Sequence, residues 1–115
     1  GVVTNQADLA ALYSMSSITL LTSKRETFSM ICAESLCCGT PVIGFKAGAP
    51  ETISIPEYSS FFKFGDINSM YKAVKKTLYS SQSDRAVIIE KAHKTYSAET
   101  MAQNYISIYR NVAYV

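Results

Sequence analysis

The chain has 115 residues, of which 48% are hydrophobic and 17% charged, and its formal net charge is +2 at pH 7. This composition is typical of one soluble domain, which at this length can bury roughly two-thirds of the surface that the unfolded chain exposes. The eleven Lys and Arg residues are scattered, so the sequence predicts no nucleic-acid partner, which would require a clustered basic face.

Membrane spans, disulfides and metal sites are also disfavoured. No apolar run approaches the length of about 20 residues that crosses a bilayer, and the first residues lack the layout of a signal peptide. The three cysteines, Cys32, Cys37 and Cys38, are odd in number and two are adjacent, which favours a reducing compartment. They offer no paired ligand spacing and His93 stands alone, so we expect no metal site.

The first half of the chain reads as a helix, a strand and a second helix. Asp8–Met15 has an acidic start and leucines three residues apart, which predicts a short helix. Ser17–Thr22 is apolar enough for a strand buried on both faces. The second helix should begin within Thr27–Ser29, where either hydroxyl can cap it, and run to Cys38, after which Gly39 ends it.

Two more strands follow. Pro41–Phe45 completes a strand-helix-strand unit of the kind that joins parallel strands. A loop containing Gly48, Pro50 and Pro56 leads to Phe61–Phe64, the third predicted strand.

The remainder is predicted to be helical. Gly65-Asp66 opens a helix over Asn68–Tyr79, and Ser83-Asp84 caps another that runs from Arg85 to about Tyr96. Five residues of the first of these helices should face the core: Met70, Ala73, Val74, Thr77 and Leu78. A last helix begins at Ser97. It carries an apolar stripe at helical spacing that we expect to be packing: Met101, Tyr105, Ile108, Tyr109 and Val112.

These elements predict an α/β fold with a Rossmann-like parallel sheet and flanking helices, in which residues 1–115 form a single domain. Three strands make a thin sheet, and the chain starts almost inside an element. We therefore expect the chain to be part of a larger domain.

Glu34 is the residue that most needs an explanation. It is the only acidic residue between Thr27 and Pro50, in an almost wholly apolar run, where an unpaired carboxylate should cost several kcal/mol. The start of its helix follows a strand and presents free N–H groups, which suit a phosphate or diphosphate. A ligand bound there could reach Glu26 at one end and Glu34 at the other, and an ionised glutamate suits a ribose diol. A simpler alternative is that Glu34 bonds a nearby amide or surfaces at the edge of the core.

A longer motif resembles a known family. Glu26, seven intervening residues, Glu34 and then Cys38–Gly44 are similar to the signature of retaining glycosyltransferases with the GT-B fold, above all glycosyltransferase family 4, or group 1. Leu9–Ser16 resembles the helix upstream of that signature, and Gly48–Glu51 resembles the glycine-rich donor loop. The similarity covers essentially the whole chain.

The resemblance implies the donor-binding, C-terminal domain of such an enzyme, present in part. Glu26 would be catalytic, beside the transferred sugar, and Glu34 would bind the ribose of a nucleotide-diphosphate sugar. The backbone of Thr27, Phe28 and Ser29 would hold the diphosphate. No cofactor and no metal would be needed.

The following loop would complete the donor site. Gly48 and Ala49 would let the chain approach the donor, and Glu51 would support that loop or touch the ligand. Lys46 is a candidate for an anion contact. The chain departs from the family in having Thr27 and Ser29 where Gly-Phe-Gly is usual, and an alanine for one loop glycine.

The resemblance therefore implies a cytoplasmic glycosyltransferase, able to lie peripherally at the inner membrane face, that transfers a sugar to a glycan or lipid acceptor in polysaccharide or cell-envelope biosynthesis. An acceptor-binding N-terminal domain would be missing, and the chain alone should be inactive. Two alternatives stay open: a domain like that of the nucleotide-sugar epimerases, and a non-catalytic interaction module with the same fold.

Overall fold

The computed structural model describes residues 1–80 and 84–113. At its centre is a parallel sheet whose strands lie in chain order: β1 (Thr19–Leu21), β2 (Val42–Phe45) and β3 (Ser59–Phe62). Leu21 pairs with Gly44, and Gly44 pairs with Phe61 on its other side. The predicted α/β fold with a parallel sheet is confirmed.

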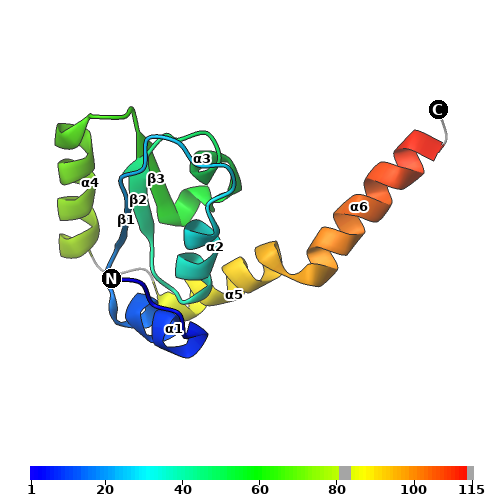
Figure 1. Cartoon of the computed structure of the whole chain (residues 1–115), viewed down its shortest axis with the longest axis horizontal. Helices are drawn as coiled ribbons and strands as arrows, with labels where there is room; N and C mark the ends of the chain where they lie inside the picture. Colours follow the sequence, from blue (N-terminus) through cyan, green and yellow to red (C-terminus); the bar gives the residue numbers. More distant parts are fainter. Residues whose placement is uncertain (81–83, 114–115) are drawn as a thin grey trace.

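Helices flank this sheet on both faces, and Figure 1 shows the strands between α4 on one side and α2 on the other. The helices are α1 (Gln6–Met15), α2 (Met30–Cys37), α3 (Pro50–Ile53), η1, a 3₁₀ turn (Pro56–Tyr58), α4 (Ile67–Tyr79), α5 (Arg85–Tyr96) and α6 (Ala98–Ala113). Asp66 and Asp84 cap α4 and α5 with their carboxylates, as expected. Ser83, the other predicted cap of α5, lies outside the described residues.

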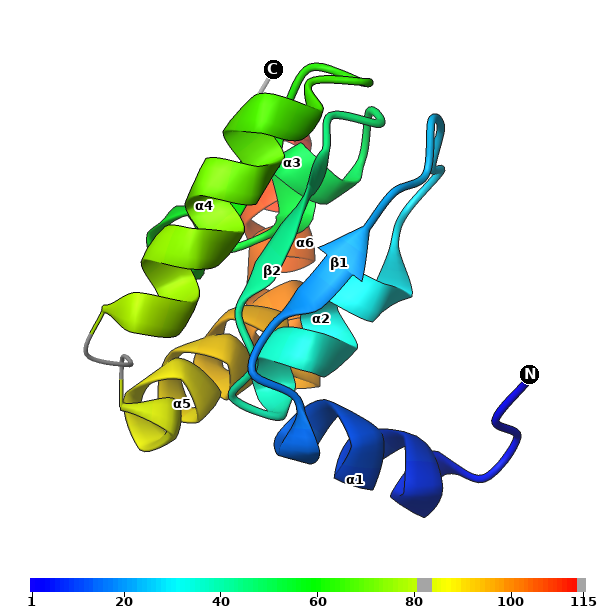
Figure 2. The ribbon, with the colours of Figure 1, turned by 90° about the vertical axis from the view of Figure 1, so that its left-hand side faces the viewer.

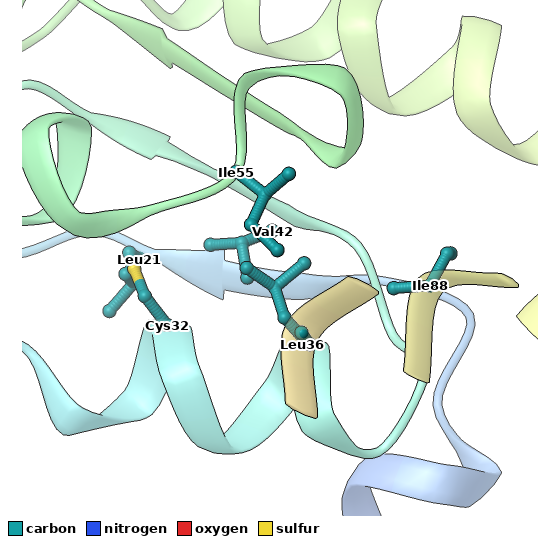
Figure 3. Packing of buried hydrophobic residues seen from close by; sticks show 7 residues of the cluster. Leu21, Cys32, Leu36, Val42, Ile55 and Ile88 are labelled. Carbon is teal, nitrogen blue, oxygen red and sulfur yellow. The ribbon is translucent and has the colours of Figure 1, made fainter. Parts of the chain in front are cut away.

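The core consists of two clusters, one on each face of the sheet. Under α2 and α5 it contains Leu21, Cys32, Leu36, Val42, Ile55 and Ile88 (Figure 3), together with Ala92. Under α4 it contains Ile43, Phe45 and Met70. Neighbouring residues of β2 alternate between the clusters, as side chains on a strand must.

Three predictions about burial or strand position were wrong. β1 is not covered on both faces, because α4 packs on β2 and β3 and leaves Leu20 52% exposed. The third strand lies two residues earlier than Phe61–Phe64, and Phe64 instead packs edge-on against Phe45 at a centroid distance of 5.2 Å. Leu78, at the end of α4, is exposed.

The end of α1 is fastened to the loop between α2 and β2. The buried hydroxyl of Thr40 donates a hydrogen bond of 2.6 Å to the carbonyl of Tyr13. The guanidinium of Arg85 donates to the carbonyls of Ser14 and Ser16. These bonds add partners at the C-terminal end of α1, where a helix leaves its last carbonyls without donors four residues further on. α1 therefore has a fixed position beside α2 (Figure 2) although none of its own residues is buried.

α6 differs most from its prediction. It extends away from the sheet and its flanking helices (Figure 1), and no residue of α6 is buried. The stripe that was expected to pack is exposed along its whole length, from Met101 at 57% to Val112 at 66%. Within the described residues the stripe is thus an open apolar surface, not core.

Candidate functional site

The candidate site lies at the ends of β1 and β2, where the loops that follow these two strands meet. The amide of Glu26, in the loop after β1, donates to the carbonyl of Ala47, after β2, at 3.0 Å. Glu26 and Gly48 also form an isolated parallel bridge. Glu26 and the glycine-containing loop that were predicted to share a site are therefore neighbours.

Glu51 holds the second loop in shape. Its carboxylate accepts hydrogen bonds from the amides of Ala47 and Gly48, each at 3.0 Å. Partial burial by itself would raise the pKa of Glu51, but these amides and the charge of Lys46 outweigh it, and the pKa lies below its ordinary value. Gly48 has φ 108°, which a side chain would rarely allow. These bonds support the loop, which is one of the two roles expected of Glu51, and a contact with the ligand stays a prediction.

The start of α2 presents unbonded amides. Within the described residues, no hydrogen bond leads from the amides of the segment that enters the helix: Thr27, Phe28, Ser29, Met30 and Ile31. The predicted side-chain cap is absent here, because Ser29 adopts a left-handed conformation with φ 64° and makes no capping bond. Its buried hydroxyl contacts the sulfur of Cys32 at 3.6 Å instead. These amides are thus without acceptors among the described residues, which is the arrangement that an anion site at a helix start requires.

The side chains of this segment have different surroundings. Thr27 is exposed and makes no hydrogen bond to the described residues. Phe28 and Met30 line an apolar groove of about 400 Å³ between α2 and α6, where Tyr105 forms part of the opposite wall. Ser29 is buried, and its hydroxyl is taken up by the contact with Cys32.

Glu34 is half-buried on the side of α2 that faces α1. Its Oε2 accepts a hydrogen bond of 3.2 Å from the hydroxyl of Tyr13. Burial first, and then the neighbouring carboxylate, raise the pKa of Tyr13 to about 12. A groove of about 290 Å³ opens beside the carboxylate, lined by Leu9 and Gln6 of α1 and by Cys37 and Cys38. Glu34 thus has a partner within the chain and also has space for a ligand.

The other predicted residues lie near the ends of the strands. Glu26 is half-buried, and its carboxylate has no hydrogen-bond partner in residues 1–80 and 84–113. Lys46 is exposed directly after β2, and Ala49 immediately precedes α3. Glu26 does not line the groove beside Glu34, so the two glutamates occupy different parts of the surface around α2.

Tyr13 is the contact that the sequence analysis missed. Its place one helical turn after Leu9 puts it on the face of α1 that turns toward α2, which is a signal that the sequence does carry.

Comparison with known proteins finds a match that includes the residues of the candidate site. The sequence model of a family described as "Glycosyl transferases group 1" matches residues 2–95, which include both loops, α2 and the sheet.

The chain belongs to the group 1 glycosyltransferases.

A relative of this glycosyltransferase chain is the N-acetyl-alpha-D-glucosaminyl L-malate synthase of Bacillus anthracis. The two are 28% identical over 113 residues, an alignment that covers 93% of this chain and 29% of the relative. The chain therefore spans less than a third of the length of that curated relative. None of the described helices is both long and apolar enough to cross a bilayer.

Proposed function

We propose that this chain is the later part of the donor-binding domain of a retaining glycosyltransferase that uses a nucleotide-diphosphate sugar. One observation carries the proposal: the amides that lead into α2 have no acceptor among the described residues, and they lie between Glu26 and Glu34 in the sequence. The family match supports a sugar-transfer reaction.

In the proposed complex the amides from Thr27 to Ile31 hold the diphosphate. The positive end of α2 adds to this attraction, and together they stabilise the charge that develops on the leaving group. This arrangement needs no metal ion or other cofactor, and nucleotide sugar is the only small ligand required. Lys46, exposed beside the glycine loop, adds a further positive charge.

The two glutamates take separate parts of the donor. Glu34 accepts hydrogen bonds from the ribose hydroxyls through the groove beside it. Glu26, whose carboxylate lacks a partner in the described part of the chain, lies beside the sugar and supports positive charge at the anomeric carbon. Gly48 and Ala49 border the sugar, and Glu51 fixes their loop.

We propose that the complete polypeptide also has an N-terminal acceptor domain; the chain corresponds to 29% of the length of its relative. We propose that the acceptor is a glycan or lipid of polysaccharide or cell-envelope biosynthesis, with the enzyme in the cytoplasm or at the inner membrane face. The relative is named for a glucosaminyl group and L-malate, so an acceptor screen should include small hydroxy acids.

The test uses the full-length polypeptide with Glu34→Ala, Glu26→Ala and, as a control, Glu90→Ala on the exposed surface of α5. Glu34→Ala should raise the donor KM by about 10- to 100-fold, which is the loss of hydrogen bonds to a charged group. Glu26→Ala should lower kcat by about 100-fold with a smaller change in donor affinity. Glu90→Ala should match the wild type.

Other results would favour the alternatives. If nucleoside diphosphates do not bind to the wild type, the chain is a non-catalytic module. If a sugar nucleotide is converted to its stereoisomer without any acceptor, the protein acts as an epimerase. Donor kinetics unchanged by Glu34→Ala would remove this residue from the site.

A further inference from the structure

We propose that Tyr13 is a positioning residue for Glu34: its hydroxyl holds one carboxylate oxygen so that the other faces the groove where a nucleotide ribose binds. This inference rests on the proposed function and assigns to α1 a part in donor recognition.

The contact has the geometry that such a role requires. The hydroxyl of Tyr13 donates to Oε2 of Glu34 at 3.2 Å, across two different helices. Oε1 of Glu34 has no hydrogen-bond partner among residues 1–80 and 84–113. Both side chains line the groove of about 290 Å³. A carboxylate can accept about four hydrogen bonds, so the tyrosine occupies one site and leaves enough for a diol.

The backbone that carries Tyr13 is itself fixed. Its carbonyl accepts the 2.6 Å hydrogen bond from Thr40, in the loop that follows α2. Arg85 binds the carbonyls of Ser14 and Ser16 immediately beyond it. α1 therefore presents the phenol to α2 from a defined position, although none of its side chains is fully buried.

A restrained carboxylate is useful because a free glutamate side chain loses rotamer freedom when it binds a ligand. Holding Glu34 in advance reduces that entropic cost at the moment of binding. The phenol stays protonated near neutral pH, since its pKa is raised to about 12, and so it remains a donor. Removing only the hydroxyl should therefore weaken ribose recognition and leave the phosphate contacts intact.

The experiment compares two ligands in the full-length polypeptide carrying Tyr13→Phe. The first is a nucleoside diphosphate, chosen as the tightest of UDP, GDP and ADP on the wild type, and the second is inorganic pyrophosphate. Isothermal titration should show about 3- to 10-fold weaker binding of the nucleotide, the worth of one hydrogen bond, and no change for pyrophosphate. Tyr13→Phe should weaken the binding of the 2′-deoxy nucleotide less than that of the ribose form. Removal of the 2′-hydroxyl and removal of the Tyr13 hydroxyl affect the same contact with Glu34, so their effects should not add.

Tyr96→Phe is the matched control. Its hydroxyl donates to the carbonyl of Ile53 at 2.7 Å and is partly buried like that of Tyr13, but Tyr96 does not line the groove beside Glu34. Tyr96→Phe should lower the thermal unfolding midpoint and leave both affinities unchanged.

The proposal is overturned if Tyr13→Phe binds the nucleotide as tightly as the wild type does while Glu34→Ala binds it much more weakly. Equal weakening for nucleotide and pyrophosphate would show a general structural effect and would also overturn it. If the wild type binds no nucleoside diphosphate, or if Glu34→Ala is without effect, the proposed function itself fails and the role of Tyr13 fails with it.

Discussion

Ser29 occupies a backbone conformation that normally belongs to glycine. Its φ of 64° makes it the one non-glycine residue with positive φ in the described part of the chain. Left-handed geometry costs an L-residue about 1–2 kcal/mol, and Ser29 adopts it at the start of α2, where the amides entering the helix are unbonded. The family's usual glycine at this place thus has a conformational reason, and serine is accommodated by burying its hydroxyl against Cys32.

Ser29→Gly should stabilise the protein. Relief of the left-handed strain exceeds the added freedom of glycine in the unfolded chain, and the net gain should be about 0.5–1 kcal/mol. Chemical denaturation followed by circular dichroism measures it. Ser29→Ala is the control, since alanine keeps the strain and loses the contact with Cys32. A glycine variant no more stable than the alanine variant would contradict this explanation.

The sequence could single out Glu26 and Glu34 as candidates because each is an acid in a recognisable place: one in the loop that follows a strand and one alone in an apolar helix. It could not show that Tyr13 meets Glu34. That contact joins positions 21 residues apart and depends on how α1 crosses α2. Nor could it show that Ser29 would turn its hydroxyl inward, because that follows from a backbone angle.

At the scale of elements, the close pairing of β1 and β2 depends on Gly44. A Cβ at this position would lie 2.7 Å from the carbonyl oxygen of Leu21 and 2.8 Å from its Cβ, with the ring of Phe61 at 3.3 Å. Contacts this short with backbone cannot be relieved by a side-chain rotation, so the two strands must separate.

Gly44→Ala should therefore destabilise the fold by about 1–3 kcal/mol or more, the usual cost of overpacking. Gly65→Ala is a suitable comparison: its φ of 87° is also unfavourable for alanine, but nothing lies within 4 Å of its Cβ. Urea denaturation should give a clearly lower free energy of unfolding for Gly44→Ala than for Gly65→Ala. The reverse order would mean that dihedral strain, not the contact between strands, sets the cost.

Helices were predicted more accurately than strands. Capping residues and apolar spacing are local signals, and they located α4 and α5 to within one residue of their observed starts. The third strand was placed too late because its position is set by pairing with β2, which is not a local property. α6 was recognised as a helix, but its spacing could not reveal that its stripe would lie open.

At the scale of the whole molecule, three carboxylates link stability to pH. The pKa values of Glu57 and Asp66 lie below their ordinary values, mainly through hydrogen bonds from Lys91 and Ser69 respectively. The pKa of Glu51 is also lowered, by the amides of its loop against the opposing effect of burial.

Because these folded-state pKa values are depressed, the stabilisation is present above the unfolded values, near pH 4–4.5. It is lost as the pH falls through the lower folded values. The thermal unfolding midpoint should be flat from about pH 6 to 8 and fall below about pH 5. The variant Glu51→Gln, Glu57→Gln, Asp66→Asn should show a shallower fall, measured by calorimetry. An unchanged acid slope in this variant would indicate that other groups dominate.

The packing of α2 fixes the distance between its first turn and Glu34. Its inner side, Cys32, Ser35 and Leu36, is fully buried, and the hydroxyl of Ser35 is tied to Thr19 and to the carbonyl of Thr40. The first turn of the helix and Glu34 are thus kept at a constant separation, about 6 Å along the axis between Met30 and Glu34. A molecule that contacts both the first turn of α2 and Glu34 must match this span, so the helix sets the length of the ligand that can reach both.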